Sequence, residues 1–327
     1  MHDPHSDIQG TLCLTISTLS NFCANRTGRW KPDYTQPCMT TYCAAHATQQ
    51  ELEHVCNELE RFIEAGELKL PVLPLAVQKV LSMNANPDFS IAELSDLIHR
   101  DQTLAGHVLR VSNSSIYAGT YKISSLSQAI SRLGRQAMVK IAVSITMQGE
   151  VFQVIGFKDE IKEIWHHSLA SAVYAQEISD ITGRRDPEMY MCGLMHQVGK
   201  PVLLKHLVEI QKRNQVLLSH EQIELVLNTY HQTVGLALAT DWKMPESVKD
   251  SCLFYRQPSD ARASNSAVNI THLASLLADW IMLDGDIDLD RIYDDPVLSA
   301  IGMSKEQVDV MLEKKDEVLA LMQAVSI

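Results

Sequence analysis

The sequence is poor in helix-breaking residues and contains no long apolar run. Glycine (14) and proline (11) are few among 327 residues, and aromatic residues make up 6% although hydrophobic residues reach 46%. This balance favours helices over turn-rich sheets. No apolar run approaches the roughly 18 residues that a membrane helix needs, so no membrane-spanning segment is predicted. The seven cysteines include no C-x2-C pair, so their spacing indicates neither a zinc ribbon nor a disulfide framework.

Basic charge is also scarce, since 28 Lys and Arg residues stand against 40 Asp and Glu, for a net charge of -12. A chain of that sign repels a phosphate backbone unless its bases cluster, so a nucleic acid is not the expected partner. The first Lys or Arg is Arg26, and a secretory signal needs a basic start before its apolar stretch. Together with reduced thiols, these features predict a cytoplasmic protein without membrane contact.

Composition and periodicity divide the chain into four segments. Residues 1–46 hold four of the seven cysteines and no sustained helical pattern, so we expect them to be disordered or atypical. A true start at Met39 is an alternative explanation for their unusual composition. Residues 47–69 predict a lead-in helix, and residues 70–265 form the expected main domain. Residues 266–327 predict C-terminal helices that complete it, with an acidic loop among them.

Hydrophobic periodicity predicts an all-α protein. No segment shows the sustained alternation that is typical of a half-buried strand. Gly183 and Gly199 follow two of the periodic segments, and glycine is a common residue just past a helix end. The predicted helices that bear on function run from Lys158 to Ile181, Pro187 to Val198, Ser219 to about Trp242, Ser264 to Leu283 and Lys305 to Ala324.

Five polar residues on apolar helices are candidate site residues. A divalent cation needs imidazole and carboxylate ligands from several helices, because one helix offers at most two on one side. The alternative is that each histidine is a hydrogen-bonded core residue, and spacing alone does not exclude it. Two of the five are seven residues apart and therefore share a helix face. The five are His167, His196, His231, His272 and Asp279.

A series of motifs runs through residues 70–265 in a specific order. The first half contains Leu70-Pro-Val-Leu-Pro, Ile98-His-Arg-Asp101, Leu109-Arg-Val-Ser-Asn-Ser114 and Arg132-Leu-Gly134. The second half contains Trp165-His-His-Ser168, Gly193-Leu-Met-His-Gln-Val-Gly-Lys200, His231 with Gly235, and Trp242 to Pro245. In this order the motifs resemble the HDOD domain, the HD-related output domain of bacterial signalling proteins. The resemblance implies a multi-helical bundle in two helical lobes.

The parent HD superfamily comprises metal-dependent phosphohydrolases whose ligands are a first His, a His-Asp doublet and a later Asp. By this resemblance, His167 matches the first His, His196 the His of the doublet, and Asp279 the last Asp. These three would bind a divalent iron, manganese or zinc ion weakly. Gln197 occupies the Asp position of the doublet. Its amide offers a metal only a neutral oxygen, whereas the activation of bound water depends on a firmly held cation.

A second departure concerns the cyclic-dinucleotide phosphodiesterase branch, which resembles this chain at Gly199-Lys200. That branch adds a His pair after the position of His231, which lies near the pocket. The matching stretch here is Phe254-Tyr255-Arg256, without a histidine. Two expected ligand positions are therefore lost.

These losses favour a non-catalytic regulatory module of signal transduction. Such a module would act by binding a signalling protein, or a small ligand such as a nucleotide or second messenger. The alternative is a metal-dependent phosphohydrolase that acts on a nucleotide or phosphodiester, with Lys200 near the phosphate. A third hypothesis is a sensor pocket that binds a small ligand without turning it over.

Overall fold

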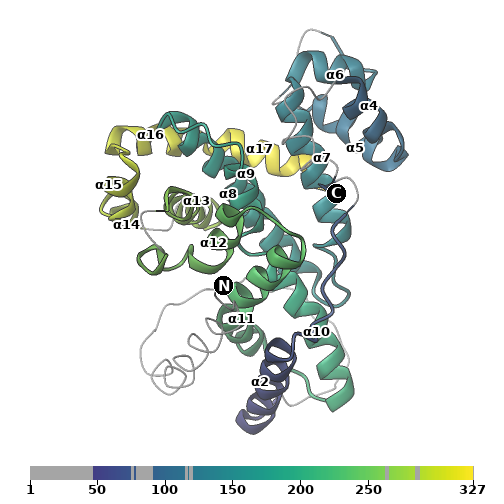
Figure 1. Cartoon of the computed structure of the whole chain (residues 1–327), viewed down its shortest axis with the longest axis vertical. Coiled ribbons are helices and arrows are strands. Elements are labelled where there is room, and N and C mark those ends of the chain that lie inside the picture. The colour runs from purple at the N-terminus through teal and green to yellow at the C-terminus, as the bar shows by residue number, and fades with distance from the viewer. Residues whose placement is uncertain are drawn as a thin grey trace, which may run out of the picture.

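The computed structural model describes residues 47–74, 77–78, 91–114, 117, 121–261, 265–283 and 288–326. The regular elements in this part of the chain are α-helices and one short 3-10 helix, without a strand, so the all-α prediction is confirmed. Helices α4 to α7 gather at one end, α2 lies at the opposite end, and the larger helical body lies between them (Figure 1). The expectation of disorder for residues 1–46 lies outside the described residues. None of the described helices is long and apolar enough to span a membrane.

Helix α2 (Gln49–Glu64) packs against α10 (Gly199–Asn214) and α11 (His220–Asp241). A capping box sets its start, because Thr48 and Glu51 each accept a hydrogen bond from the other's backbone amide. The apolar side of α2 is buried on the two longer helices. The lead-in helix predicted within residues 47–69 is therefore a docked part of the fold.

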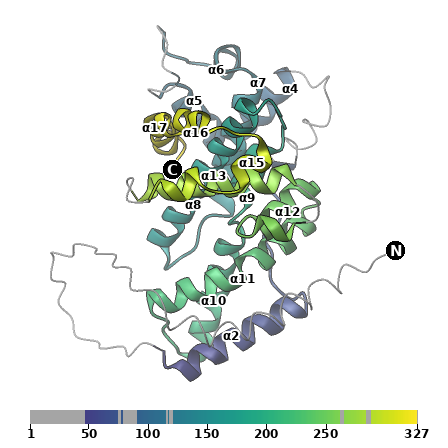
Figure 2. The same ribbon diagram turned by 90° about the vertical axis from the view of Figure 1, so that its left-hand side faces the viewer.

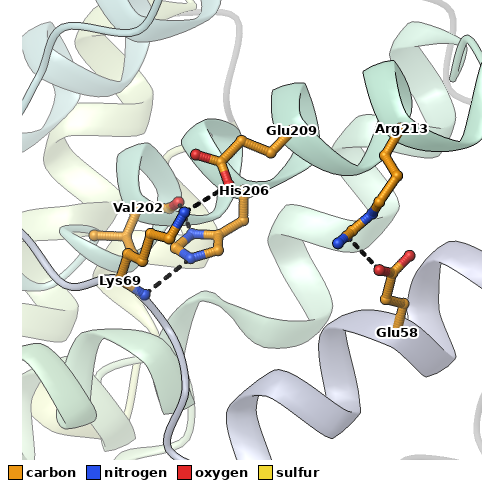
Figure 3. Close-up of polar contacts among 6 residues, drawn as sticks. All are labelled: Glu58, Lys69, Val202, His206, Glu209 and Arg213. Atoms are coloured by element: carbon orange, nitrogen blue, oxygen red, sulfur yellow. Dashed lines mark hydrogen bonds and ion pairs between the residues drawn. The ribbon is translucent and has the colours of Figure 1, made fainter.

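Polar contacts fasten α2 and the segment after it to α10 (Figure 3). Glu58, which is nearly buried, pairs with Arg213 and accepts a hydrogen bond from Asn214 Nδ2 at 2.9 Å. The backbone amide of Lys69 donates to His206 Nε2 at 3.1 Å, while His206 Nδ1 bonds a carbonyl of its own helix at 2.9 Å. Because a carbonyl only accepts, Nδ1 carries the proton and Nε2 is left to accept from Lys69.

The first lobe consists of four helices that pack against one another. Its closing contact is the side chain of Asn113, which donates to Ile123 O and accepts from Ile123 N, both at 2.8 Å. The amide therefore holds the chain that leads into the third of these helices. They are α4 (Ile91–His99), α5 (Gln102–Ser112), α6 (Leu126–Leu133) and α7 (Arg135–Glu150).

The second lobe is built around α8 (Lys158–Ile181), whose bounds agree with the prediction. Its central part is buried, including Trp165, Leu169 and Tyr174. The helices that pack closely along it are α9 (Met189–Met195) and α13 (Ser266–Met282). Helix α12 (Glu246–Phe254) covers α9 and α11.

The single helix predicted from Pro187 to Val198 is wrong at both ends. Helix α9 begins at Met189 and ends at Met195, and Gly199 begins α10 instead of closing the helix before it. A short turn at residues 196–198 separates them. Gly199 is therefore not a helix stop, and its lack of a β-carbon allows α10 to approach α11 closely.

The C-terminal helices cover α8 and reach the first lobe. The single helix predicted from Lys305 to Ala324 is two helices, α16 (Lys305–Glu313) and α17 (Lys315–Val325). The break lets α17 contact α8, α5 and α7 together (Figure 2). Tertiary packing therefore overrides the continuous periodicity of this segment. Two short helices precede it, α14 (Asp290–Tyr293) and α15 (Val297–Ile301).

Candidate functional site

Two glycines bring four helices together around the turn at residues 196–198. A β-carbon at Gly193 would lie 2.4 Å from Ser171 O in α8, and one at Gly199 would lie 2.0 Å from His231 O in α11. Only a residue without a β-carbon allows backbones to approach this closely. The turn is therefore clamped between α8 and α11, and the side chains that it carries are buried among neighbouring helices.

His167 on α8 and Asp279 on α13 form a direct contact. His167 Nε2 lies 2.9 Å from Asp279 Oδ1. Burial alone would raise the pKa of Asp279, but the hydrogen bond and charge of His167 and the charges of Lys200 and Arg256 outweigh it and lower that pKa. Asp279 is therefore a carboxylate at neutral pH. His167 Nδ1 is buried, without a hydrogen-bond partner in the described part of the chain.

His196 is completely buried in the turn after α9. Its Nδ1 lies 2.6 Å from Gly193 O, so Nδ1 donates the proton and Nε2 keeps its lone pair. That Nε2 is buried and has no partner among the described residues. The ring centroid lies 5.3 Å from that of His167. Burial lowers the pKa of His196 well below its ordinary value. Its neighbours His167, Lys200 and Arg256 lower that pKa further.

Tyr255, which follows α12, fills the space between two of the histidines. Its ring centroid lies 4.6 Å from that of His196 and 5.9 Å from that of His231, both near edge-to-face. His231 Nδ1 donates to Leu227 O at 2.8 Å, so its Nε2 accepts the proton of Tyr255 Oη at 2.9 Å. Burial raises the pKa of Tyr255 to about 12. The hydroxyl therefore remains a donor at neutral pH.

Gln197 and Arg256 lie close enough to Tyr255 to oppose the effect of burial on its pKa. Burial and the charge of Arg256 lower the pKa of Lys200 to about 8, although Asp279 opposes this shift. The positive charges of Lys200 and Arg256 therefore lie beside His196 and His231 and lower the pKa values of both.

The structure gathers every candidate but His272. His272 Nδ1 donates to Tyr255 O at 2.7 Å and its Nε2 lies 3.0 Å from Asp295 Oδ2, so both nitrogens have structural partners. Tyr255 and Arg256 were not among the predicted site residues. The available signal was a tyrosine and an arginine at the place where the resemblance implied a His pair. In the described part of the chain, no group of three or more His, Cys, Asp or Glu residues is arranged to hold a metal ion.

The buried histidines predict a pH-dependent stability. The pKa values of His196 and His231 are both held well below the ordinary value, chiefly by burial, so at acidic pH the unfolded chain binds protons that the folded chain does not. Stability rises with pH under that condition. The contribution of the two neutral histidines to the free energy of unfolding is therefore complete above about pH 7. It is lost as the pH falls below the unfolded pKa near 6.5, at roughly 1.4 kcal/mol per pH unit for each histidine.

The lowered pKa of Asp279 also makes the stability rise with pH, but only below the unfolded pKa of the carboxyl near 4. Urea unfolding between about pH 7.5 and about pH 5.5 isolates the histidine contribution, because that window lies above the carboxylate range. Equal free energies of unfolding across this window would contradict the prediction.

A family model for the HDOD domain matches residues 70–258. An uncharacterized protein of Treponema pallidum (strain Nichols) is 26% identical over 195 residues, which cover 57% of this chain and 37% of that protein. The match therefore spans well under half of that relative.

Solved structures share the fold. An HDOD domain protein of unknown function from Geobacter sulfurreducens superposes with a TM-score of 0.65 at 22% identity, covering 85% of this chain and 97% of that one. A Shewanella amazonensis SB2B protein that bears the name of a metal-dependent phosphohydrolase gives a TM-score of 0.64 at 17% identity, over 84% and 99% of the two chains. A Marinobacter aquaeolei VT8 protein named for signal transduction gives 0.58 at 20% identity, over 84% and 66%. Because the family model matches more than half of its length, this chain belongs to the HDOD domain family.

Proposed function

We propose that this protein is a non-catalytic HDOD module of signal transduction that acts by binding a protein partner or a small ligand. The observation that carries this proposal is the place of Tyr255 against His196 and His231. Its ring lies near edge-to-face to both, and its hydroxyl donates to His231 Nε2 at 2.9 Å. The tyrosine thus lies between two of the histidines and hydrogen-bonds to a nitrogen that a metal centre would need.

The remaining donors do not fit a divalent cation. Such an ion needs several ligand atoms with free lone pairs at one point. Both nitrogens of His231 are already bonded, and Nε2 of His167 is engaged by Asp279. Gln197 replaces a carboxylate, and the cations of Lys200 and Arg256 would repel a second positive charge.

A metal-dependent phosphohydrolase is the alternative, and one observation favours it. His167 Nδ1 and His196 Nε2 are both buried without a partner among the described residues, and buried nitrogens of this kind call for an explanation. Two imidazole lone pairs with Asp279 nearby would be a minimal ligand set. In that case Lys200 would face the phosphate.

Metal uptake and hydrolysis decide between the two functions. The purified full chain is incubated with Fe(II), Mn(II) or Zn(II), its metal content is measured after removal of free ion, and hydrolysis of bis(p-nitrophenyl) phosphate is followed. We expect far less than one equivalent of metal and no hydrolysis above background. One equivalent of metal with hydrolysis that is lost in both His196→Ala and Asp279→Asn would establish the enzyme instead.

Asp295→Asn supplies the matched control for this experiment. Asp295 pairs with His272 at 3.0 Å much as Asp279 pairs with His167 at 2.9 Å, but it lies outside the cluster. An effect of Asp279→Asn that Asp295→Asn reproduced would report on folding and not on metal binding.

A further inference from the structure

An open pocket lies between the first lobe and helix α17, apart from the histidine cluster. Its volume is about 650 Å³, within the range of small-molecule sites. One wall is α5 with the residues after it, a second is the segment at residues 122–123, and the third is the end of α17. The pocket therefore joins parts of the chain that are distant in sequence.

The charges at this pocket are of one sign. Arg110 and Lys122 line it from two sides, and its described lining residues include no acidic side chain. Arg110 Nη2 donates to Ser326 O at 3.0 Å, which leaves other guanidinium donors available. Lys122 has no ion pair or hydrogen bond to any described residue. Leu109 and Ala324 add apolar surface, so the pocket is complementary to an anion that carries an apolar body.

Gly106 lines the pocket at an exposed position of α5. It lies in the middle of α5, where glycine is unfavourable to the helix. A β-carbon at this position would meet no atom within 4 Å. Unlike Gly193 and Gly199, Gly106 is therefore not required by a close approach of backbones, and its effect is to leave space at the pocket.

Ser114 supplies a second indication of a ligand. It lines the pocket, and its buried hydroxyl has no hydrogen-bond partner in the described part of the chain. Buried hydroxyls are usually hydrogen-bonded, and one that is not calls for an explanation. An oxygen of a bound ligand would satisfy it after a small movement of the side chain.

We propose that this pocket binds a small organic anion, with its head group between Arg110 and Lys122 and its apolar body over Gly106. The site is independent of the histidine cluster and of whether that cluster holds metal. Since α17 also contacts α8, an occupied pocket would strengthen the contact between the first lobe and the rest of the protein.

The test uses a charged probe and its neutral counterpart on the full chain. Fluorescence titration with anilinonaphthalene sulfonate measures the affinity for an aromatic anion, and N-phenylnaphthylamine lacks the sulfonate. Gly106→Leu places a large side chain in the pocket and should weaken sulfonate binding by about tenfold or more. Lys122→Gln should weaken sulfonate binding by about two- to fivefold and leave the neutral probe unchanged.

Two matched variants control for general effects. Gly149→Leu makes the same substitution in α7, at a helical glycine whose added β-carbon would also meet no atom within 4 Å. Lys212→Gln removes an exposed lysine on α10, outside the pocket. Both should bind the sulfonate as the unmodified chain does. Unchanged binding by Gly106→Leu, or equal losses for both probes in Lys122→Gln, would overturn the proposal.

Discussion

Replacing Gly199 by alanine is expected to destabilise the protein by about 3 kcal/mol or more. The new β-carbon would lie 2.0 Å from His231 O and 2.7 Å from Gly235 N. These are backbone atoms, which cannot turn aside as a flexible side chain can. Helix α10 would have to move away from α11 and would displace Lys200 at its start. Urea unfolding, with the slope compared between variants, measures the loss.

Gly235→Ala is the control for this effect, because it adds a methyl group on the opposite side of the same helix contact. Its β-carbon would lie 3.5 Å from Cys252 Cβ and 3.6 Å from Gly199 N, which are ordinary contact distances. We expect a change within about 1 kcal/mol, since alanine also improves helix propensity. If Gly199→Ala proved as stable as Gly235→Ala, the close contact of α10 and α11 would not hold the site together.

Local sequence signals account for the helix boundaries that were predicted correctly. The capping box of Ser219 and Gln222 begins α11, and Gly183 at φ +72 follows the end of α8. The break at Lys314 has no such signal, because neither glycine nor proline is near it. We attribute the break to the packing of α17 against α5 and α7. These helices are distant in sequence, so no local pattern signals the break.

The same distinction applies to the site. Periodicity placed His272 and Asp279 on one face of a helix, but their partners are set by long-range packing. His272 pairs with Asp295, 23 residues later, and Asp279 pairs with His167, 112 residues earlier. Tyr255 could not be recognised from a pattern of metal ligands, because it donates a hydrogen bond to a histidine and does not itself match a ligand position.

Tyr255→Ala is the second substitution with a large expected effect. It removes a ring that lies 4.6 Å from His196 and 5.9 Å from His231 by centroid distance, and truncation of a buried aromatic to alanine costs about 3–5 kcal/mol. Tyr255→Phe keeps the ring but leaves His231 Nε2 without its donor. We expect that variant to cost about 1–3 kcal/mol.

The hydroxyl of Tyr174 offers a direct comparison. Tyr174 is also buried, but its Oη has no hydrogen-bond partner among the described residues, so Tyr174→Phe should be neutral or stabilising. Denaturant unfolding of the two Phe variants at neutral pH therefore separates a hydroxyl with partners from one without. If Tyr255→Phe cost no more than Tyr174→Phe, the hydrogen bond from Tyr255 to His231 would not stabilise the cluster. The proposal that Tyr255 closes the histidine cluster to metal would then lose its main support.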